Sequence, residues 1–381
     1  MKVECGGNSY QKQYGKFCHF SKKPNWQQKM LNNLAPELLH LIAYTGLLSH
    51  KDVLSLVQTC GAVAEKLVGD AYGRDKLRSL RGVLDCVENG WLRALRFAMQ
   101  TKPSADDIHY SLACAASNGY SDIVAFLLAW RGPDGEWVDA TANKNVAVSW
   151  AILDGHTNST KLLLDWQGPN GERVDPTTER RIETAARNGF TDTVMLLFDD
   201  PRIDDQSRYL AFLGAVSHGQ VSTVCHMLEW QGCNGEYIDP THRGCMAKYR
   251  ALGYRKASVL EVLLAWRGPN GEHVNQSATQ ESLFLDFWRV ATCPGDNAVE
   301  LVMLVTSDPI FNPGYSDSSV IRWAAKYGCT EILERFLNDP RVDATAENNQ
   351  AINQANQNNH LDAVRLLLAW RGPNGERCTL D

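Results

Sequence analysis

The side chains best suited to metal chemistry in this sequence gather between residues 225 and 245. Cysteine and histidine are common zinc ligands, and the group found there is Cys225, His226, Cys233, His242 and Cys245. Their spacings match no zinc-binding pattern, and no Cys-x-x-Cys pair occurs in the chain. The first two fall in a stretch that recurs elsewhere as Ala-Phe, and Cys233 replaces the proline of a recurring loop. We therefore predict no metal site.

The sequence also lacks the patterns that mark common catalytic sites. It contains no glycine-rich phosphate-binding loop, no His-Glu-x-x-His and no nucleophile elbow. Aspartate and histidine are plentiful, but they recur with the repeats described below, as solvated loop residues do. We predict that the protein is not an enzyme and uses no cofactor.

Composition and charge narrow the classes of partner. The 381 residues carry a net charge of −6 at pH 7, so we expect no nucleic-acid partner, which would need a basic surface. The amino-terminal residues include no apolar signal segment. The longest wholly apolar run, residues 123–130, is far shorter than the roughly 20 residues of a membrane-spanning helix. We expect no membrane association, a cytoplasmic location, and cysteines that serve as small buried hydrophobes.

From residue 81 onward the sequence repeats itself with a period of 30 to 36 residues. The stretch that begins Ala-Ala-Ser-Asn-Gly at Ala115 returns as Ala-Ala-Arg-Asn-Gly at Ala185. Related stretches begin at Ala151, Ala215, Ala324 and Ala355, and degenerate ones lie near Ala251 and Ala291. Residues 81–381 are therefore predicted to form an array of about eight or nine repeats.

Each repeat is predicted to contain two antiparallel helices. The first carries an apolar residue three positions before a small pair, namely Leu112, Val148, Ile182, Phe212, Ile321 and Ile352. A residue that tolerates left-handed backbone then ends the helix: Gly119, Gly155, Gly189, Gly219, Gly328 or Asn359. The second helix directs Val124, Leu127, Leu128 and their equivalents inward. One such pair cannot bury its own apolar face, so stability must come from stacking.

The longer connections between repeats are predicted to be projecting hairpins. They begin at Trp130, Trp166, Trp230, Trp266 and Trp370, and each contains an Asp-Gly or Asn-Gly turn. We expect the tryptophans to pack the base of each hairpin. The residue after each loop glutamate varies, being Trp137, Arg173, Tyr237, His273 and Arg377, whereas the next residue is apolar at Val138, Val174, Ile238 and Val274. Alternation along a strand places the two on opposite faces.

These varied positions are rich in tryptophan, tyrosine and arginine, the residues most enriched at binding hot spots. One hypothesis is that they form a ladder of contacts to a partner protein. The alternative is that they only shield the loop backbone.

Residues 31–70 are predicted to be a separate small helical segment. Pro36 starts a first helix that carries Leu38, Leu39 and Ile42, and Gly46 ends it. Ser49 and Asp52 form a capping box for a second helix, and a third spans about 62–68. Residues 1–30 are polar and lysine-rich, which predicts a mobile tail.

Two family resemblances follow from these residues. The array at 81–381 resembles the ankyrin repeat, with its helix pairs, interhelical glycine and projecting hairpin, although the family's Thr-Pro-Leu-His opening is missing. Residues 34–67 resemble the F-box in Leu34, Pro36, Glu37, Leu38, Ile42, Leu47, Asp52, Val53, Leu54, Leu56, Thr59 and Cys60. The F-box pattern departs here through the inserted Ala35 and a missing tryptophan near its end. The combination looks like proteins encoded by large DNA viruses of amoebae, which would place this one in the host cytoplasm.

The resemblances imply an all-α fold, an ankyrin-type solenoid with hairpin loops preceded by a small F-box-like bundle. They also imply a protein-protein interaction function. Residues 34–67 would dock a Skp-type adaptor of a cullin ubiquitin ligase through Leu34, Pro36, Leu38 and Ile42, while the array presents a target protein. The alternative is an ankyrin scaffold or decoy binder with no ubiquitin-ligase link, whose amino-terminal helices only cap the array.

Overall fold

The structure, a computed structural model, describes residues 36, 39, 43, 50–59, 61–68, 82–101, 103–177, 180–291 and 297–380. The predicted polar tail at 1–30 lies outside these residues. None of the described helices combines the length and hydropathy that a bilayer-spanning helix needs. The chain divides into two compact units, an N-terminal unit of Met1–Ala151 with Asn158–Val174 and a C-terminal unit of Ile152–Thr157 with Asp175–Asp381.

Described secondary structure is helical apart from isolated bridges in the hairpins. Up to residue 165 the helices are α3 (His50–Thr59), α4 (Gly61–Val68), α6 (Gly82–Glu88), α7 (Leu92–Ala98), the short η1 (Met99–Thr101), α8 (Ala105–Ser117), α9 (Ser121–Ala129), α10 (Ala142–Leu153) and α11 (Thr157–Asp165). The C-terminal unit continues with α12 (Arg181–Asn188), α13 (Thr191–Phe198), α14 (Asp205–His218), α15 (Val221–Glu229), α16 (His242–Gly253), α17 (Ala257–Ala265), α18 (Gln280–Ala291), α19 (Ala298–Val305), α20 (Tyr315–Tyr327), α21 (Thr330–Phe336), α22 (Ala346–Gln357) and α23 (Leu361–Ala369).

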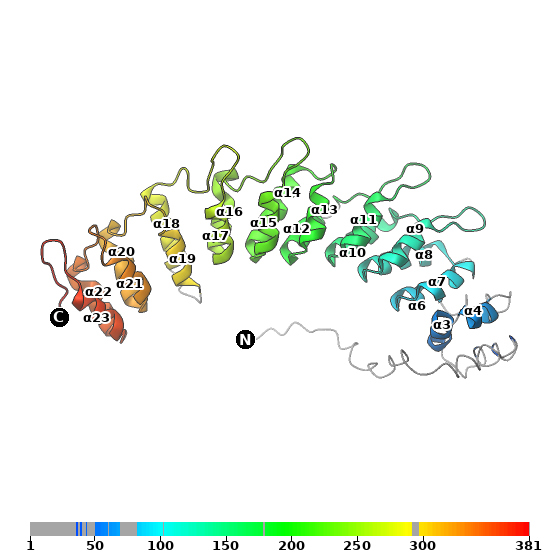
Figure 1. Cartoon of the computed structure of the whole chain (residues 1–381), viewed down its shortest axis with the longest axis horizontal. Helices are drawn as coiled ribbons and strands as arrows, with labels where there is room; N and C mark the ends of the chain where they lie inside the picture. Colours follow the sequence, from blue (N-terminus) through cyan, green and yellow to red (C-terminus); the bar gives the residue numbers. More distant parts are fainter. Residues whose placement is uncertain are drawn as a thin grey trace. The chain divides into compact units, whose positions relative to one another are not determined.

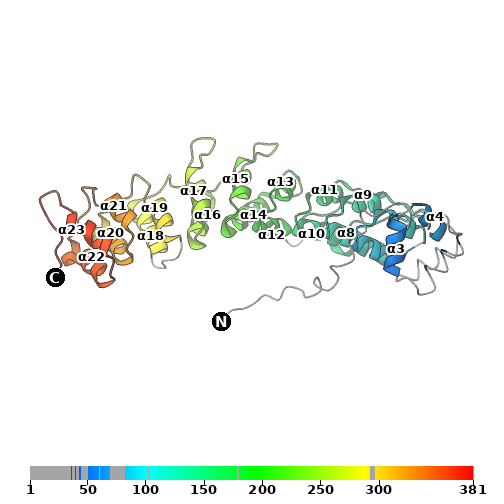
Figure 2. The same ribbon diagram turned by 60° about the horizontal axis from the view of Figure 1, so that its bottom comes forward.

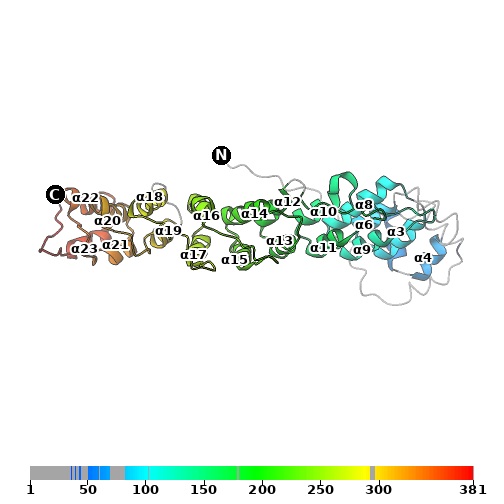
Figure 3. The ribbon, with the colours of Figure 1, turned by 90° about the horizontal axis from the view of Figure 1, so that it is seen from above.

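The helices pack as consecutive pairs (Figure 1). In the C-terminal unit the even-numbered helices from α12 to α22 make one layer and the odd-numbered helices from α13 to α23 make the other (Figure 3). First helices pack on first helices, as α12 does on α14 and α14 on α16, and second helices pack on second helices, as α13 does on α15. The prediction of an all-α array of repeated helix pairs is confirmed.

Buried residues follow the predicted pattern. The apolar residue before each small pair is at most 3% exposed at every predicted position, and the paired alanines are fully buried at Ala115, Ala185 and Ala324. Val124 and Leu127 of α9 are also fully buried. The core therefore lies between the two helices of a repeat and between neighbouring repeats.

Left-handed backbone ends the first helices as predicted. The φ angles are 71° at Gly119, 78° at Gly189, 69° at Gly328 and 60° at Asn359. A second constraint acts at Gly328, because a Cβ atom there would lie only 2.6 Å from Nδ1 of His360 in the next repeat. The His360 Nε2 atom is 3.1 Å from the Lys326 carbonyl oxygen at the end of the same first helix. Glycine thus permits both the turn and the close stacking of repeats.

A feature that the sequence did not predict occurs where α10, α16, α20 and α22 begin. Each opens with three consecutive residues of positive φ, for example Ser316, Asp317 and Ser318 at φ 53–56°. Most residues in these segments are Asn, Asp, Ser or Gly, short or polar side chains suited to such turns. The regular part of each of these helices therefore starts about one turn later than its first residue.

In the N-terminal unit, α3 and α4 confirm the helices predicted after Ser49 and around 62–68. Both pack on α7, and α3 also contacts α6. Their apolar faces are fully buried at Val53, Leu54, Val57, Val63, Ala64 and Leu67. The Ala94 amide of α7 donates a 3.0 Å hydrogen bond to Oε1 of Gln58. These helices are therefore joined to the first helix pair of the array by both apolar and polar contacts.

The core of the C-terminal unit contains a buried ion pair. Lys248 of α16 stands three residues before Ala251, where other repeats have an apolar residue. Its Nζ lies 2.9 Å from Oδ2 of Asp286 on α18, and the two side chains are 7% and 3% exposed. Lys248 also donates to Oδ1 of Asn275, whose Nδ2 donates to Asp308. Two charges buried in this way must remain paired, since a lone buried charge is strongly unfavourable.

We predict that Lys248→Met lowers the free energy of unfolding by about 3–5 kcal/mol, because it leaves the Asp286 carboxylate buried without its cation. The double variant Lys248→Met/Asp286→Leu should recover most of this loss. Urea denaturation followed by circular dichroism measures both changes. As a control, Arg365→Met removes an exposed ion pair with Asp362 and should change stability by less than about 1 kcal/mol. A single variant as stable as the wild type would contradict this account.

Candidate binding site at the hairpins

The predicted hairpins share one backbone geometry. Antiparallel bridges pair Arg131 with Trp137, Gln167 with Arg173 and Gln231 with Tyr237. In the third hairpin the Gly232 amide donates to the Glu236 carbonyl at 2.8 Å, and the Gly235 amide donates to the Gly232 carbonyl at 3.0 Å. Gly235 adopts φ 86°, and its equivalents Gly135, Gly171, Gly271 and Gly375 adopt 85–91°. This geometry is a tight turn followed by one left-handed residue, which favours glycine.

Each hairpin is tied internally by its glutamate. In four of them the carboxylate accepts hydrogen bonds from the amide and the side chain of the turn asparagine, as Glu236 does from Asn234 at 2.9 and 2.8 Å. The side-chain hydrogen bond from Asn234 is the main reason that the pKa of Glu236 lies below its usual value. The first hairpin has Asp134 in place of asparagine, and only its backbone amide donates to Glu136.

The tryptophans lie at the hairpin bases as predicted. A Cβ atom on Gly232 would be 3.0 Å from Cη2 of Trp230, so the indole covers the first glycine of its own loop. The Trp230 indole N–H donates to Oδ1 of Asp199, just after α13 of the previous repeat, at 2.9 Å. Trp370 donates in the same way to the Leu337 carbonyl after α21, also at 2.9 Å. Each of these two side chains therefore fixes its hairpin to the preceding repeat.

The varied residue and its apolar neighbour face opposite sides, as alternation predicts. The neighbours are at most 4% exposed at Val138, Val174, Ile238, Val274 and Cys378. Of the varied residues, Arg173, Tyr237 and Arg377 are exposed, and Trp137 and His273 are half-buried. Figure 2 shows the hairpins after α15 and α17 projecting from the same side of the C-terminal unit. Tyr237 and His273 belong to these two hairpins.

Trp137 departs from the pattern because part of its ring is already covered. It stacks on Trp166 at the base of the next hairpin, with 5.7 Å between ring centroids and 25° between the planes. This stacking joins neighbouring repeats within the N-terminal unit. Of the varied residues, Tyr237 has the more open aromatic ring, with 38% of its surface exposed.

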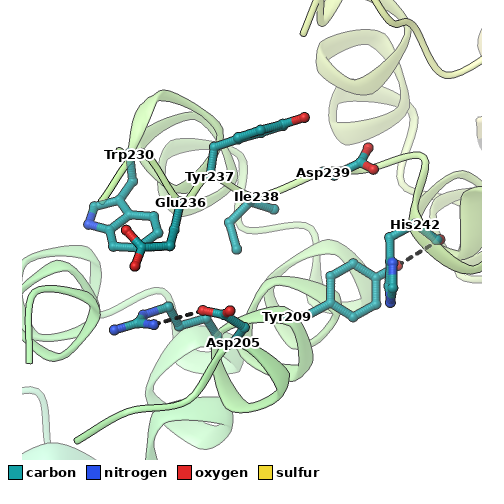
Figure 4. A pocket seen from close by; sticks show the side chains of 10 residues that line it. Asp205, Tyr209, Trp230, Glu236, Tyr237, Ile238, Asp239 and His242 are labelled. Carbon is teal, nitrogen blue, oxygen red and sulfur yellow. Dashed lines mark hydrogen bonds and ion pairs between the residues drawn. The ribbon is translucent and has the colours of Figure 1, made fainter. Parts of the chain in front are cut away.

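Tyr237 also lines a cavity of about 340 Å³ in the C-terminal unit. The hairpin contributes Trp230, Glu236, Ile238 and Asp239, α14 contributes Asp205, Arg208 and Tyr209, and α16 contributes His242. Figure 4 shows the hairpin side chains facing those of α14 across the cavity. Sequence reasoning found the hairpin residues but missed those on α14 and α16. Their only sequence signal is polar and aromatic character on the side of a first helix away from its small pair.

The described lining of the cavity includes the carboxylates of Asp205, Glu236 and Asp239 and the guanidinium of Arg208. The Arg208 guanidinium lies 5.0 Å above the Trp230 ring and also pairs with Asp205 at 2.9 Å. It donates further to the Phe198 and Asp200 carbonyls at the end of α13, so its hydrogen bonds serve the fold. The Tyr209 hydroxyl donates to the His242 carbonyl at 3.1 Å. Burial, and next the nearby Asp239 carboxylate, raise the pKa of Tyr209 to about 12.

The aromatic rings and carboxylates that line the cavity suit recognition of a side chain that is apolar along its length and positively charged or hydrogen-bond donating at its end.

The five candidate zinc ligands belong to three elements. Cys225 and His226 are on α15, Cys233 is exposed on the following hairpin, and His242 and Cys245 are on α16, where the Cys245 thiol donates to the Val274 carbonyl at 3.1 Å. Within the described part of the chain, no group of three or more Cys, His, Asp or Glu side chains is placed to hold a metal ion.

Three of the four adaptor-docking candidates, Leu34, Leu38 and Ile42, lie outside the described residues, while Pro36 is helical and exposed. Comparison with known protein families finds no match to this chain, and comparison with characterised proteins also finds none.

We predict that Asn234→Ala raises the pKa of Glu236 toward its ordinary value, because it removes the main hydrogen bond that favours the carboxylate. Titration of side-chain carboxylates by NMR measures the shift, and Glu172 and Glu376 in unchanged hairpins serve as internal controls. A lowered folded pKa stabilises the hairpin above the ordinary glutamate pKa, about 4.3, and this contribution is lost as the pH falls through the folded value. An unchanged Glu236 titration would refute the assignment.

Proposed function

We propose that this chain is an ankyrin-type repeat protein that binds another protein through its hairpins and first helices. The observation that carries the proposal is the constant hairpin backbone with a different side chain at one outward position. The glutamate-bound turn, the basal tryptophan and the buried apolar neighbour hold that position fixed. A fixed backbone that displays Arg173, Tyr237 and Arg377 is what selective recognition of a macromolecule requires.

The contact ladder is proposed with unequal contributions from its members. Tyr237 borders a cavity and keeps an exposed ring, so we assign it the largest contribution. Trp137 is partly occupied by its stacking on Trp166, so its substitution would also disturb the repeat interface. Arg173 and Arg377 are exposed and occupy the equivalent position of their own hairpins. The alternative role, in which these residues only shield loop backbone, predicts no effect on binding.

We further propose that residues 31–70 join the protein to a Skp-type adaptor of a cullin ubiquitin ligase, so that the array supplies the target. Leu34, Pro36, Leu38 and Ile42 carry the docking, by resemblance to the F-box. The chemistry of ubiquitin transfer would belong to other subunits.

A second candidate function has a specific observation in its favour. The apolar faces of α3 and α4 are buried and packed on α7, and Gln58 accepts the Ala94 amide. Helices used in this way act as a cap that covers the apolar end of an array. In a scaffold or decoy binder, this capping role would be the whole function of α3 and α4. The two functions differ in whether the segment before α3 engages an adaptor.

The ladder predicts that Tyr237→Ala weakens capture of the protein partner by at least about thirtyfold, since a hot-spot side chain contributes about 2 kcal/mol or more. Arg173→Ala should have a smaller effect, as an exposed charge does. Affinity purification from the natural host identifies the partner, and titration with that purified partner measures the change. Substitution of Cys233, exposed elsewhere on the same hairpin, by Ala is the matched control. Equal affinity of all the variants would exclude the ladder.

The adaptor proposal predicts that purified Skp-type adaptor binds the wild-type chain, and that Leu38→Asp/Ile42→Asp abolishes this binding by introducing charge into an apolar contact. A pull-down with the purified adaptor measures it, and circular dichroism checks that helix content is retained. The control is Tyr237→Ala, which should keep adaptor binding. A wild-type chain that binds no adaptor would leave the cap and scaffold function standing.

A further inference from the structure

Two first helices of the C-terminal unit, α18 and α20, separate their exposed charges along their length. Cations occupy the later halves of α16, α18 and α20, at Arg250, Arg289, Arg322 and Lys326. The acidic residues Glu281, Asp317 and Glu347 stand in the first turns of α18, α20 and α22, whereas Asp286 is buried. This separation complements the helix dipole. It also produces a row of cations on a chain whose net charge is −6.

A second cavity, of about 380 Å³, lies in this row. Its lining includes Trp288 from α18, Ser319, Arg322, Lys326 and Tyr327 from α20, and Gln350 and Gln354 from α22. These helices belong to the same layer of the C-terminal unit (Figure 3). None of the described lining residues carries a carboxylate. The cavity therefore has a positive charge that its own walls do not balance.

Aromatic and amide side chains complete the walls. Trp288 and Tyr327 are each 36% exposed, and the Lys326 ammonium lies 5.2 Å from the centre of the Tyr327 ring. Gln350 and Gln354 stand four residues apart and share one face of α22. Amide side chains both donate and accept hydrogen bonds, which matches the backbone of an extended peptide.

Two polar groups at the cavity have unused bonding capacity. Arg322 approaches its acidic neighbour Glu347 only to 3.8 Å, longer than a charge-assisted hydrogen bond, and that glutamate is 56% exposed. The Ser319 side chain is only 2% exposed, and within the described structure its hydroxyl has no hydrogen-bond partner. Of the two groups, Arg322 is the one open to a ligand, because the Ser319 oxygen is enclosed by protein.

We propose that this cavity receives the carboxylate of a glutamate or aspartate from an acidic segment of the partner protein. Arg322 and Lys326 bind the carboxylate, Trp288 and Tyr327 contact its aliphatic stem, and the glutamines hold the adjoining backbone. This inference rests on the proposed protein-binding function and specifies the chemistry of the partner. A nucleic acid suits the surface less well, because the acidic first turns beside the row repel a continuous phosphate backbone.

A short fluorescein-labelled peptide of alternating glutamate and serine tests the proposal directly by fluorescence anisotropy. The wild-type chain should bind it, and Arg322→Glu/Lys326→Glu should weaken binding by at least about tenfold. Arg322→Lys/Lys326→Arg keeps the charge and should retain most of the affinity. Arg365→Glu, a charge reversal at an exposed site on α23, is the matched control and should bind like the wild type. Circular dichroism of each variant verifies the fold.

Glu347→Gln should strengthen peptide binding, whereas the charge reversals weaken it. Removing the carboxylate that competes for Arg322 should tighten peptide binding several-fold. A wild-type chain that does not bind the peptide, or a charge-reversed variant that binds equally well, overturns the proposal. A thymidine oligonucleotide of similar length that binds more tightly through the same two cations also overturns it.

Hairpin variants separate this inference from the function on which it rests. Tyr237 is not among the residues that line the second cavity, so Tyr237→Ala should leave peptide binding unchanged. If the peptide binds as expected while every hairpin variant keeps full affinity for the partner, the hairpin ladder fails and the acidic-segment site stands. If hairpin variants lose the partner and the peptide does not bind, the ladder stands and this site fails.

Discussion

Close contact between successive helix pairs is the constraint on which this structure depends. A single pair has an apolar face and nothing of its own to cover it, so each repeat is stable only against a neighbour. Fully buried alanines, such as Ala115 and Ala324, let the helices approach. At Gly328 the approach is so close that His360 fills the space a side chain would need. The choice of side chain is therefore most restricted at the positions where neighbouring repeats contact each other.

The hairpins keep the same backbone shape whatever side chain they display outward. Their shape depends on hydrogen bonds of the backbone and of the loop glutamate. Glu236 holds the turn, Gly235 supplies the left-handed residue, and Trp230 ties the base to the preceding repeat. None of these contacts involves the outward side chain of Tyr237. The chain can thus change the chemistry at that position from repeat to repeat while the backbone stays the same. Rigid support for interchangeable side chains is a requirement of precise recognition.

Much of this architecture could be predicted from sequence because it depends on local patterns. The positions of Gly119 and Gly328, the buried Ile321 and the hairpin turns all follow from helix periodicity and turn chemistry. Contacts between repeats were harder to predict. Lys248 is visible as a charge at an apolar position, but its partner belongs to a degenerate repeat whose alignment the sequence left uncertain.

The candidate site shows the same limit. Alternation predicted which hairpin residues face outward, and the buried neighbours Val138 and Ile238 agree with it. It gave no information about distances between hairpins, so the stacking of Trp137 on Trp166 was missed. The cavity residues on first helices, such as Tyr209 and Trp288, were missed for a related reason. Their exposure depends on how neighbouring helices pack, which no single repeat encodes.

The ion pair between Lys248 and Asp286 makes two neighbouring repeats depend on each other. Other interfaces between repeats bury mainly apolar residues, which do not require one particular neighbour. A deletion that removed only one of these two repeats would set a buried charge against an apolar neighbour. Loss of both repeats would therefore cost the array less stability than loss of one of them. In this part of the chain the buried ion pair fixes which two repeats must be neighbours. Exchanging either of them for another repeat would lower the stability of the array.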